Sequence, residues 1–139
     1  MAEISLQVDN DFAALGPLSV QVRDFLCDCK APDAASFLAD LVIEELLTNT
    51  IKYGYDDKAA HRIVVRVEFH DGHLCIEVRD NGHAFDPLAQ EAPDLTLPAE
   101  ERPIGGLGIH LVRQMTDEVR YERNGNENIV TALKTFPEE

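Results

Sequence analysis

The stretch VRDNGHAFDP, residues 78–87, ends a strand pattern and begins a turn. Before it, apolar residues from Leu74 to Val78 alternate with other residues, as in a half-buried strand. Asp80 therefore stands at a strand end with Gly82 beside it, where a carboxylate can approach a flat base and accept a hydrogen bond from its amino group. An ordinary Asp-Asn-Gly turn is the alternative interpretation.

Further alternating segments lie on both sides of this one. The apolar residues from Ile63 to Phe69 lead into Asp71-Gly72, a tight-turn signal, and so predict a β-hairpin with the strand through Val78. A short strand is expected near residues 4–8. A closing hairpin is expected around residues 119–136, with its turn at 124–126.

Three segments have apolar residues at helical spacing. The first runs from about Phe12 to Cys29, and the second runs from Asp33, which is expected to cap it, to about Tyr53. The third begins at the glycine run of residues 105–108. Its apolar side is expected to hold Ile109, Leu111, Val112 and Met115.

The order of these segments is strand, helix, helix, hairpin, loop, helix, hairpin. It predicts an α/β (α+β) two-layer sandwich with a mixed, mostly antiparallel sheet and helices on one face. The 139 residues are expected to form one domain, 1–139. The loop at residues 87–103 is rich in proline and acidic residues, and a loop of this length is usually functional or disordered.

The composition and charge argue against several partners and locations. A net charge of −14 disfavours nucleic acid and anionic membrane as partners, and it also repels ATP at long range. A nucleotide site would therefore need local backbone donors and a metal ion. The sequence lacks an apolar run of membrane-spanning length and a signal-peptide pattern, and its three cysteines fit a reduced compartment, so a cytoplasmic location is expected.

The second helical segment places polar residues in an apolar stripe. Leu38, Val42, Glu45 and Asn49 share one face by three- and four-residue spacing. Burying a carboxylate and an amide is costly without partners, which a metal-bound ligand would supply. Alternatively, this face turns to solvent near the end of the helix and both residues are hydrated.

The glycine run GGLG, residues 105–108, opens the third helical segment. Bare backbone N–H groups and the positive end of a helix dipole favour an anion there. A flexible hinge is the alternative. The run lacks the Gly-Lys-Ser/Thr of a P-loop and the preceding strand of a dinucleotide fingerprint.

Taken together, Glu-x-x-x-Asn on a helix, Asp-x-Gly-x-x-Phe-Asp-Pro after a strand and Gly-Gly-Leu-Gly opening a helix form an ordered series. This series resembles the Bergerat-fold (GHKL) ATPases, which include gyrase, MutL and sensor histidine kinases. Two segments, ELLTNTIKYGY (residues 45–55) and FDP (residues 85–87), are most similar to the RsbW-type anti-sigma factor serine kinases.

The resemblance implies roles for four residues of the second helix. Asn49 would coordinate Mg²⁺ bound to ATP, and Glu45 would be the general base. Lys52 would reach phosphate oxygens, with a solvated surface lysine as the alternative. Tyr53 would line the ribose or the base.

The resemblance also implies the rest of a nucleotide site. Asp80 would accept a hydrogen bond from the adenine amino group, Gly82 would give the base room, and Thr131 would contact adenine through water. Thr131 as an ordinary strand residue is the alternative. The phosphates would lie against Gly105, Gly106, Leu107 and Gly108, under an ATP lid at about residues 88–104.

The activity implied by the resemblance is that of an Mg-ATP-dependent serine/threonine kinase. Its substrate would be a STAS-domain antagonist of an anti-sigma factor, and it could also bind a sigma factor or form a homodimer. A nucleotide-gated binding module with little or no kinase activity is the alternative.

Overall fold

The computed structural model describes residues 2–57, 59–89 and 106–137. Its described strands form one sheet in the order β1-β2-β3-β5-β4, and every pairing in that order is antiparallel. The expected two-layer sandwich is confirmed. The strands are β1 (Ala2–Asp9), β2 (Arg62–His70), β3 (His73–Asp80), β4 (Glu118–Asn124) and β5 (Glu127–Thr135).

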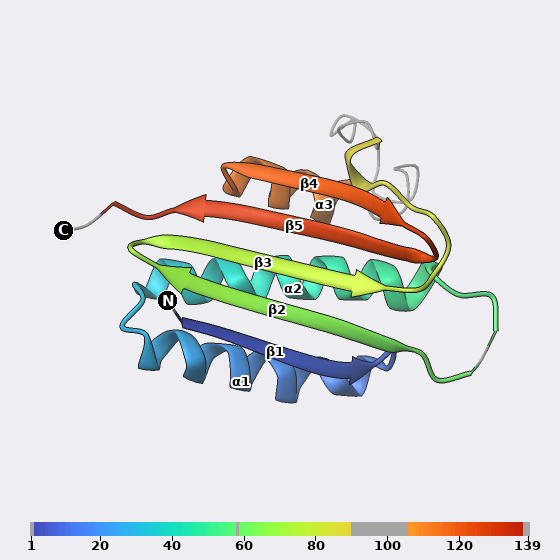
Figure 1. The fold of residues 1–139 in the computed structure, drawn as a ribbon, viewed down its shortest axis with the longest axis horizontal. Coiled ribbons are helices and arrows are strands. Elements are labelled where there is room, and N and C mark those ends of the chain that lie inside the picture. The colour runs from blue at the N-terminus through green and yellow to red at the C-terminus, as the bar shows by residue number, and fades with distance from the viewer. Residues whose placement is uncertain (1, 58, 90–105, 138–139) are drawn as a thin grey trace.

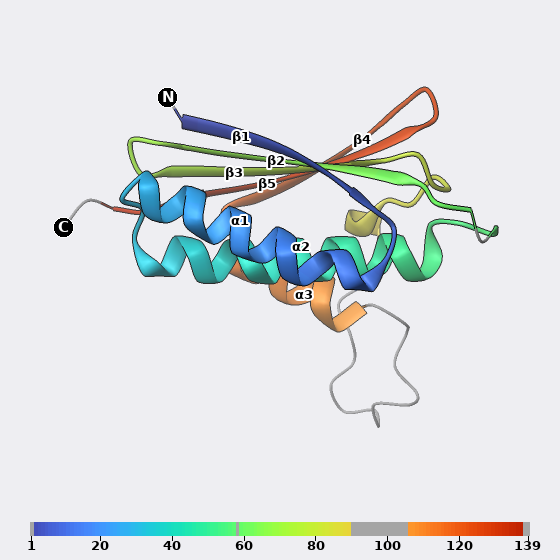
Figure 2. The same cartoon turned by 90° about the horizontal axis from the view of Figure 1, so that it is seen from below.

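The helices lie together on one face of the sheet, as Figures 1 and 2 show. They are α1 (Leu15–Asp28), α2 (Asp33–Tyr53) and α3 (Gly106–Met115), with short 3-10 turns η1 (Phe12–Ala14) and η2 (Pro87–Ala89). Within the described part of the chain, none of the helices combines the length and the apolar character that a membrane crossing requires.

The start of α2 differs from the expectation. Pro32 occupies the N-cap with an extended backbone, and Asp33 is the first helical residue rather than the cap. Proline is compatible with this position because its ring fixes φ and its carbonyl still accepts a hydrogen bond, here from the Ala35 N–H at 2.9 Å. The Asp33 carboxylate still favours the helix start through the helix dipole.

The predicted turn between β2 and β3 is confirmed. Asp71 and Gly72 have φ angles of 51° and 79°, as a two-residue hairpin turn requires. The resulting register pairs Val65 with Val78, so alternate β3 residues face the helices up to Asp80 at the strand end. The pleat therefore aims the Asp80 side chain at the helical layer.

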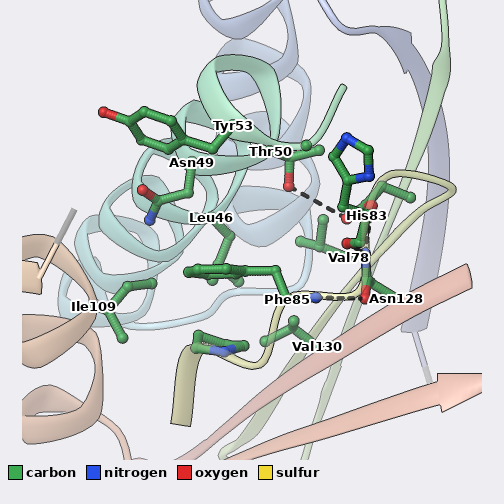
Figure 3. A pocket seen from close by; sticks show the side chains of 13 residues that line it. Leu46, Asn49, Thr50, Tyr53, Val78, His83, Phe85, Ile109, Asn128 and Val130 are labelled. Carbon is green, nitrogen blue, oxygen red and sulfur yellow. Dashed lines mark hydrogen bonds between the residues drawn. The ribbon is translucent and has the colours of Figure 1, made fainter. Parts of the chain in front are cut away.

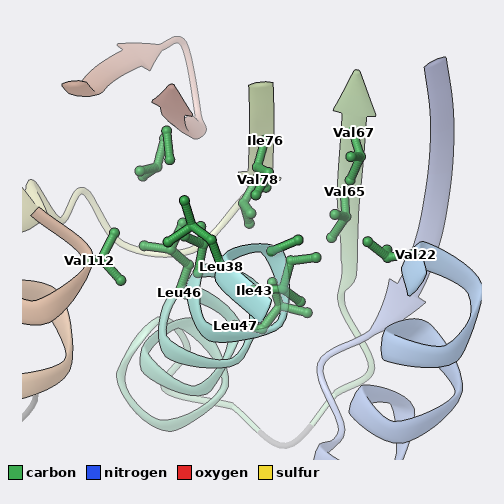
Figure 4. Close-up of a cluster of buried hydrophobic side chains, with 14 of the residues drawn as sticks. Val22, Leu38, Ile43, Leu46, Leu47, Val65, Val67, Ile76, Val78 and Val112 are labelled. Atoms are coloured by element: carbon green, nitrogen blue, oxygen red, sulfur yellow. The ribbon is translucent and has the colours of Figure 1, made fainter. Parts of the chain in front are cut away.

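The hydrophobic core fills the space between the two layers. Figure 4 shows Val22 of α1, Leu47 of α2, Val65 of β2 and Val112 of α3 around it, and all four are fully buried or nearly so. The apolar side predicted for α3 is only partly buried. Ile109 and Val112 enter the core, whereas Leu111 and Met115 are exposed.

Candidate functional site

A pocket lies between α2, α3 and the adjacent ends of β3 and β5 (Figure 3). Its apolar walls come from Leu46, Val78, Ile109 and Val130, together with Phe85 of the loop after β3. Its polar lining includes Asn49, Thr50, Asp80 and Asn128. A mostly apolar pocket with a few converging polar groups is the usual setting for a small ligand such as a nucleobase.

Asp80 forms the polar end of this pocket and is only 7% exposed. Its Oδ1 accepts hydrogen bonds from the Gly82 N–H at 2.9 Å and from Asn128 Nδ2 at 3.0 Å. Its Oδ2 accepts from the Thr50 hydroxyl at 3.3 Å. Because these partners are all donors, the carboxylate is held as an acceptor, which is the role predicted for it toward an amino group.

Asn128 is a site residue that sequence reasoning missed. Its Nδ2 also donates to the His83 carbonyl at 2.7 Å, and its Oδ1 accepts from the Tyr121 hydroxyl at 2.6 Å and from the Phe85 N–H at 3.3 Å. The side chain is 4% exposed and links β4, β5 and the loop after Asp80. Strand alternation could have identified it, because Asn128 is an even number of residues from the apolar Val130 and Ala132 and so lies on the same face of the strand.

Gly82 is required by a close approach of two backbones. A Cβ on Gly82 would lie 2.5 Å from the Gly54 carbonyl oxygen at the end of α2. The same carbonyl accepts from the His83 N–H at 2.8 Å, and Arg123 Nη1 donates to the Gly82 carbonyl at 2.8 Å. The loop after β3 is thereby fixed to both α2 and β4.

Glu45 lies on α2 against the first residues of α3. A Cβ on Gly108 would be only 1.7 Å from Glu45 Oε2, so the carboxylate occupies the space that a side chain would need. Burial raises the pKa of Glu45 above its ordinary value, and the charge of Glu44 raises it further, while Lys52 opposes both. Glu44 itself is exposed.

Asn49 follows Glu45 by one helical turn and lines the pocket. Its Nδ2 atom is buried and has no hydrogen-bond partner among the residues that the structure describes. A buried amide left in this way is costly unless a ligand satisfies it. Its donor and its carbonyl oxygen match a phosphate oxygen and a Mg²⁺ ion, so the residues present fit a metal-bound nucleotide.

The other residues predicted for the site differ in how close they lie to the pocket. Tyr53 lines the pocket, whereas Lys52 is exposed in the last turn of α2 and Gly106 and Leu107 begin α3. Gly105 and nearly all of the expected lid, residues 90–104, lie outside the described residues.

The structure does not bring Thr131 into this pocket. Thr131 pairs with Glu77 on β3 and with Arg120 on β4, and this row of residues faces away from the helices. Glu77 forms ion pairs there with Arg66 at 2.8 Å and with Arg79 at 2.6 Å. Successive strand residues alternate between faces, so the position opposite Asp80 belongs to Asn128.

The fold and the site together are those of a two-layer α+β domain with a pocket that is lined by the buried carboxylate of Asp80 and by Ile109 near the start of α3. A family model described as the histidine kinase-like ATPase domain matches residues 9–134. The chain belongs to this family of ATPase domains.

Curated relatives are named as serine-protein kinases or as an anti-sigma F factor. The serine-protein kinase RsbW of Listeria monocytogenes is 29% identical over 84 residues, covering 58% of this chain and 54% of that protein. RsbW of Bacillus velezensis is 27% identical, covering 64% and 58%. The anti-sigma F factor of Clostridium botulinum is 28% identical, covering 66% and 64%. The chain thus spans between about half and two thirds of the length of these relatives.

A solved structure has the same fold. The crystal structure of the RsbU and RsbW domains of a Mycobacterium tuberculosis protein matches 97% of this chain and 32% of that chain, with a TM-score of 0.69 and 18% identity. The similarity extends over the described sheet and its helices.

Proposed function

We propose that the chain is a protein kinase of the anti-sigma factor type, which transfers the γ-phosphoryl group of ATP to a serine or threonine of a STAS-domain partner. One observation carries the proposal: the Glu45 carboxylate lies against the first turn of α3, one helical turn from Asn49, beside the pocket that ends at Asp80. The serine-protein kinase names of the Listeria and Bacillus relatives support the same activity.

In this proposal the pocket binds the base of ATP. Asp80 accepts a hydrogen bond from the adenine amino group, and Asn128 and Thr50 hold its carboxylate in place. Gly82 lets the loop after β3 pack closely against the end of α2, which leaves room in the pocket for the base. Tyr53 contacts the ribose or base, while Lys52 and the first turn of α3, including Gly106 and Gly108, face the phosphates.

The proposed transfer uses two side chains of α2. Mg²⁺, when bound with ATP, neutralises charge on the phosphate groups during phosphoryl transfer. Asn49 would hold this metal through its amide oxygen. Glu45 takes the proton of the attacking hydroxyl, and its raised pKa makes it a better base than an ordinary carboxylate.

The test is transfer of label from γ-labelled ATP, in the presence of Mg²⁺, to a STAS-domain partner from the same organism. Wild type is compared with Glu45→Gln, and Glu44→Gln serves as the matched control because it removes an equal charge from the exposed neighbour. We expect label on the partner with wild type and Glu44→Gln, and a rate lower by on the order of a hundredfold or more with Glu45→Gln, because this is what a general base typically contributes. Equal labelling by all three proteins would eliminate Glu45 as the base.

A nucleotide-gated binding module is the second candidate, and the name of the Clostridium relative, an anti-sigma F factor, favours it. The two candidates differ in one measurement. ATP binding without labelled partner in any of the three proteins would support the module, whereas label on the partner would support the kinase.

A further inference from the structure

Gly108 and Glu45 meet where α3 packs beside α2. The three heavy atoms nearest to a Cβ built on Gly108 all belong to Glu45: Oε2 at 1.7 Å, Cδ at 2.4 Å and Cγ at 3.2 Å. Gly108 lies within α3 and does not have a positive φ, so its backbone would accept any L-residue. The Glu45 side chain is therefore what requires a glycine at this position.

We propose that Gly108 is a positioning residue, whose missing side chain lets α3 hold the Glu45 carboxylate in place for phosphoryl transfer. The inference rests on the function proposed above. It gives Gly108 a role beyond the phosphate contact that the glycine run predicts, because the space above its Cα is filled by a carboxylate of this chain.

The surroundings fix this contact relative to the pocket. Leu46, which follows Glu45, and Ile109, which follows Gly108, both line the pocket and are 5% and 3% exposed. Val112 anchors α3 in the core one turn later. The first turn of a helix also has N–H groups without intrahelical acceptors, and this end of the dipole favours a carboxylate.

An alanine at position 108 would move the carboxylate and little else. The atom that a new methyl group would meet first is the end of a flexible side chain, which can rotate away, so the fold and the base-binding end of the pocket remain. Misplacing a catalytic group by about 1 Å can cost on the order of a hundredfold in rate. Gly108→Ala is therefore expected to affect transfer far more than binding.

The kinetic test combines Gly108→Ala with Glu45→Gln. We expect Gly108→Ala to lower the kcat of transfer by on the order of a hundredfold, with the KM for the partner changed less than about threefold and any rise in the Kd of ATP far smaller than the loss in kcat. Added to Glu45→Gln, it should cause no further loss. Gly16→Ala is the matched control, since a Cβ on this α1 glycine would meet nothing within 4 Å. Independent, multiplying losses would overturn the proposal.

A second measurement needs neither ATP nor activity. In the free protein, Glu45→Gln should shift the amide resonance of Ile109 in the wild-type background and should shift it much less in the Gly108→Ala background. An equal shift in both backgrounds would overturn the positioning role. Coupled shifts in a protein that never labels a partner would instead retain the Glu45–Gly108 contact and reject the proposed kinase activity.

Discussion

Asp80→Asn keeps the size of a buried side chain while converting one carboxylate oxygen into an NH₂ group. Oδ1 accepts from two donors, Gly82 N–H and Asn128 Nδ2, so the amide oxygen must take this side. The NH₂ group then takes the Oδ2 position beside Thr50. The Thr50 hydroxyl can rotate and accept, because a hydroxyl is both donor and acceptor.

The variant should therefore fold but bind adenine poorly. The hydrogen bonds to Gly82, Asn128 and Thr50 remain, but they now involve a neutral amide instead of a carboxylate. We therefore expect the free energy of unfolding to fall by no more than about 1 kcal/mol. Binding loses a charge-assisted hydrogen bond to the adenine amino group, worth about 1.5–3 kcal/mol, which raises the Kd of ATP by roughly 10–150-fold. The new NH₂ donor also faces the donor of the base, which weakens binding further.

Calorimetric titration with ATP and urea unfolding measure the two effects separately. Asp80→Ala is the control, since it leaves the buried Gly82 N–H without its acceptor and should cost about 3 kcal/mol of stability as well as binding. An ATP Kd for Asp80→Asn within threefold of wild type would refute the adenine assignment. Equal destabilisation by both variants would refute the hydrogen-bond reasoning.

Three other perturbations have definite expected outcomes. Asn128→Asp puts a carboxylate oxygen 3.0 Å from Asp80, a repulsion of about 5.5 kcal/mol at an effective dielectric of about 20, and should lower the urea midpoint strongly at neutral pH. Gly82→Ala meets the backbone of Gly54 and should cost about 1–3 kcal/mol in the same assay and weaken ATP binding. Burial raises the pKa of Glu77, but its two arginine partners outweigh burial and hold it below the ordinary value. A carboxylate whose pKa is lower in the folded than in the unfolded protein stabilises the fold at pH values above its unfolded pKa. This stabilisation is lost as the pH falls through the folded-state pKa. Glu77→Gln should therefore weaken the dependence of the free energy of unfolding on pH at the acid end.

The strands and the β2–β3 hairpin could be predicted because their signals are local. Alternation defines each strand, and Asp71-Gly72 fixes the β2–β3 register through the turn it forms. Once that register is set, the side chain at the end of β3 must face the helices with Leu74, Ile76 and Val78. The position of Asp80 therefore follows from sequence alone.

The face of α2 was harder to predict. Buried residues include Leu38 and Val42 but also Ile43 and Leu47, because α2 packs against the sheet and against α1 and α3 on either side. A helix buried over so wide an arc does not have one sharp apolar stripe. Periodicity therefore could not decide whether Glu45 was hydrated or held.

Thr131 shows a limit of a different kind. The resemblance to known kinases predicts a threonine on the last strand as an adenine contact, and Thr131 is the threonine that fits by residue type. Strand parity gives a different answer, because a shift of one position moves a side chain to the opposite face. Here Asn128 stands opposite Asp80 and Thr131 stands opposite Glu77.

The net charge of −14 and an anionic ligand are compatible for a local reason. Exposed charges are screened beyond roughly 8–10 Å at physiological salt, whereas hydrogen-bond donors and a metal act at contact distance. The described acidic groups nearest the pocket are not all free to repel phosphate: Asp80 is enclosed by three donors and Glu45 is held against α3. Each carboxylate thus has a fixed contact at a different part of the site. In the proposed function this fixation lets an acidic chain present one carboxylate to the base of ATP and the other to the reacting hydroxyl.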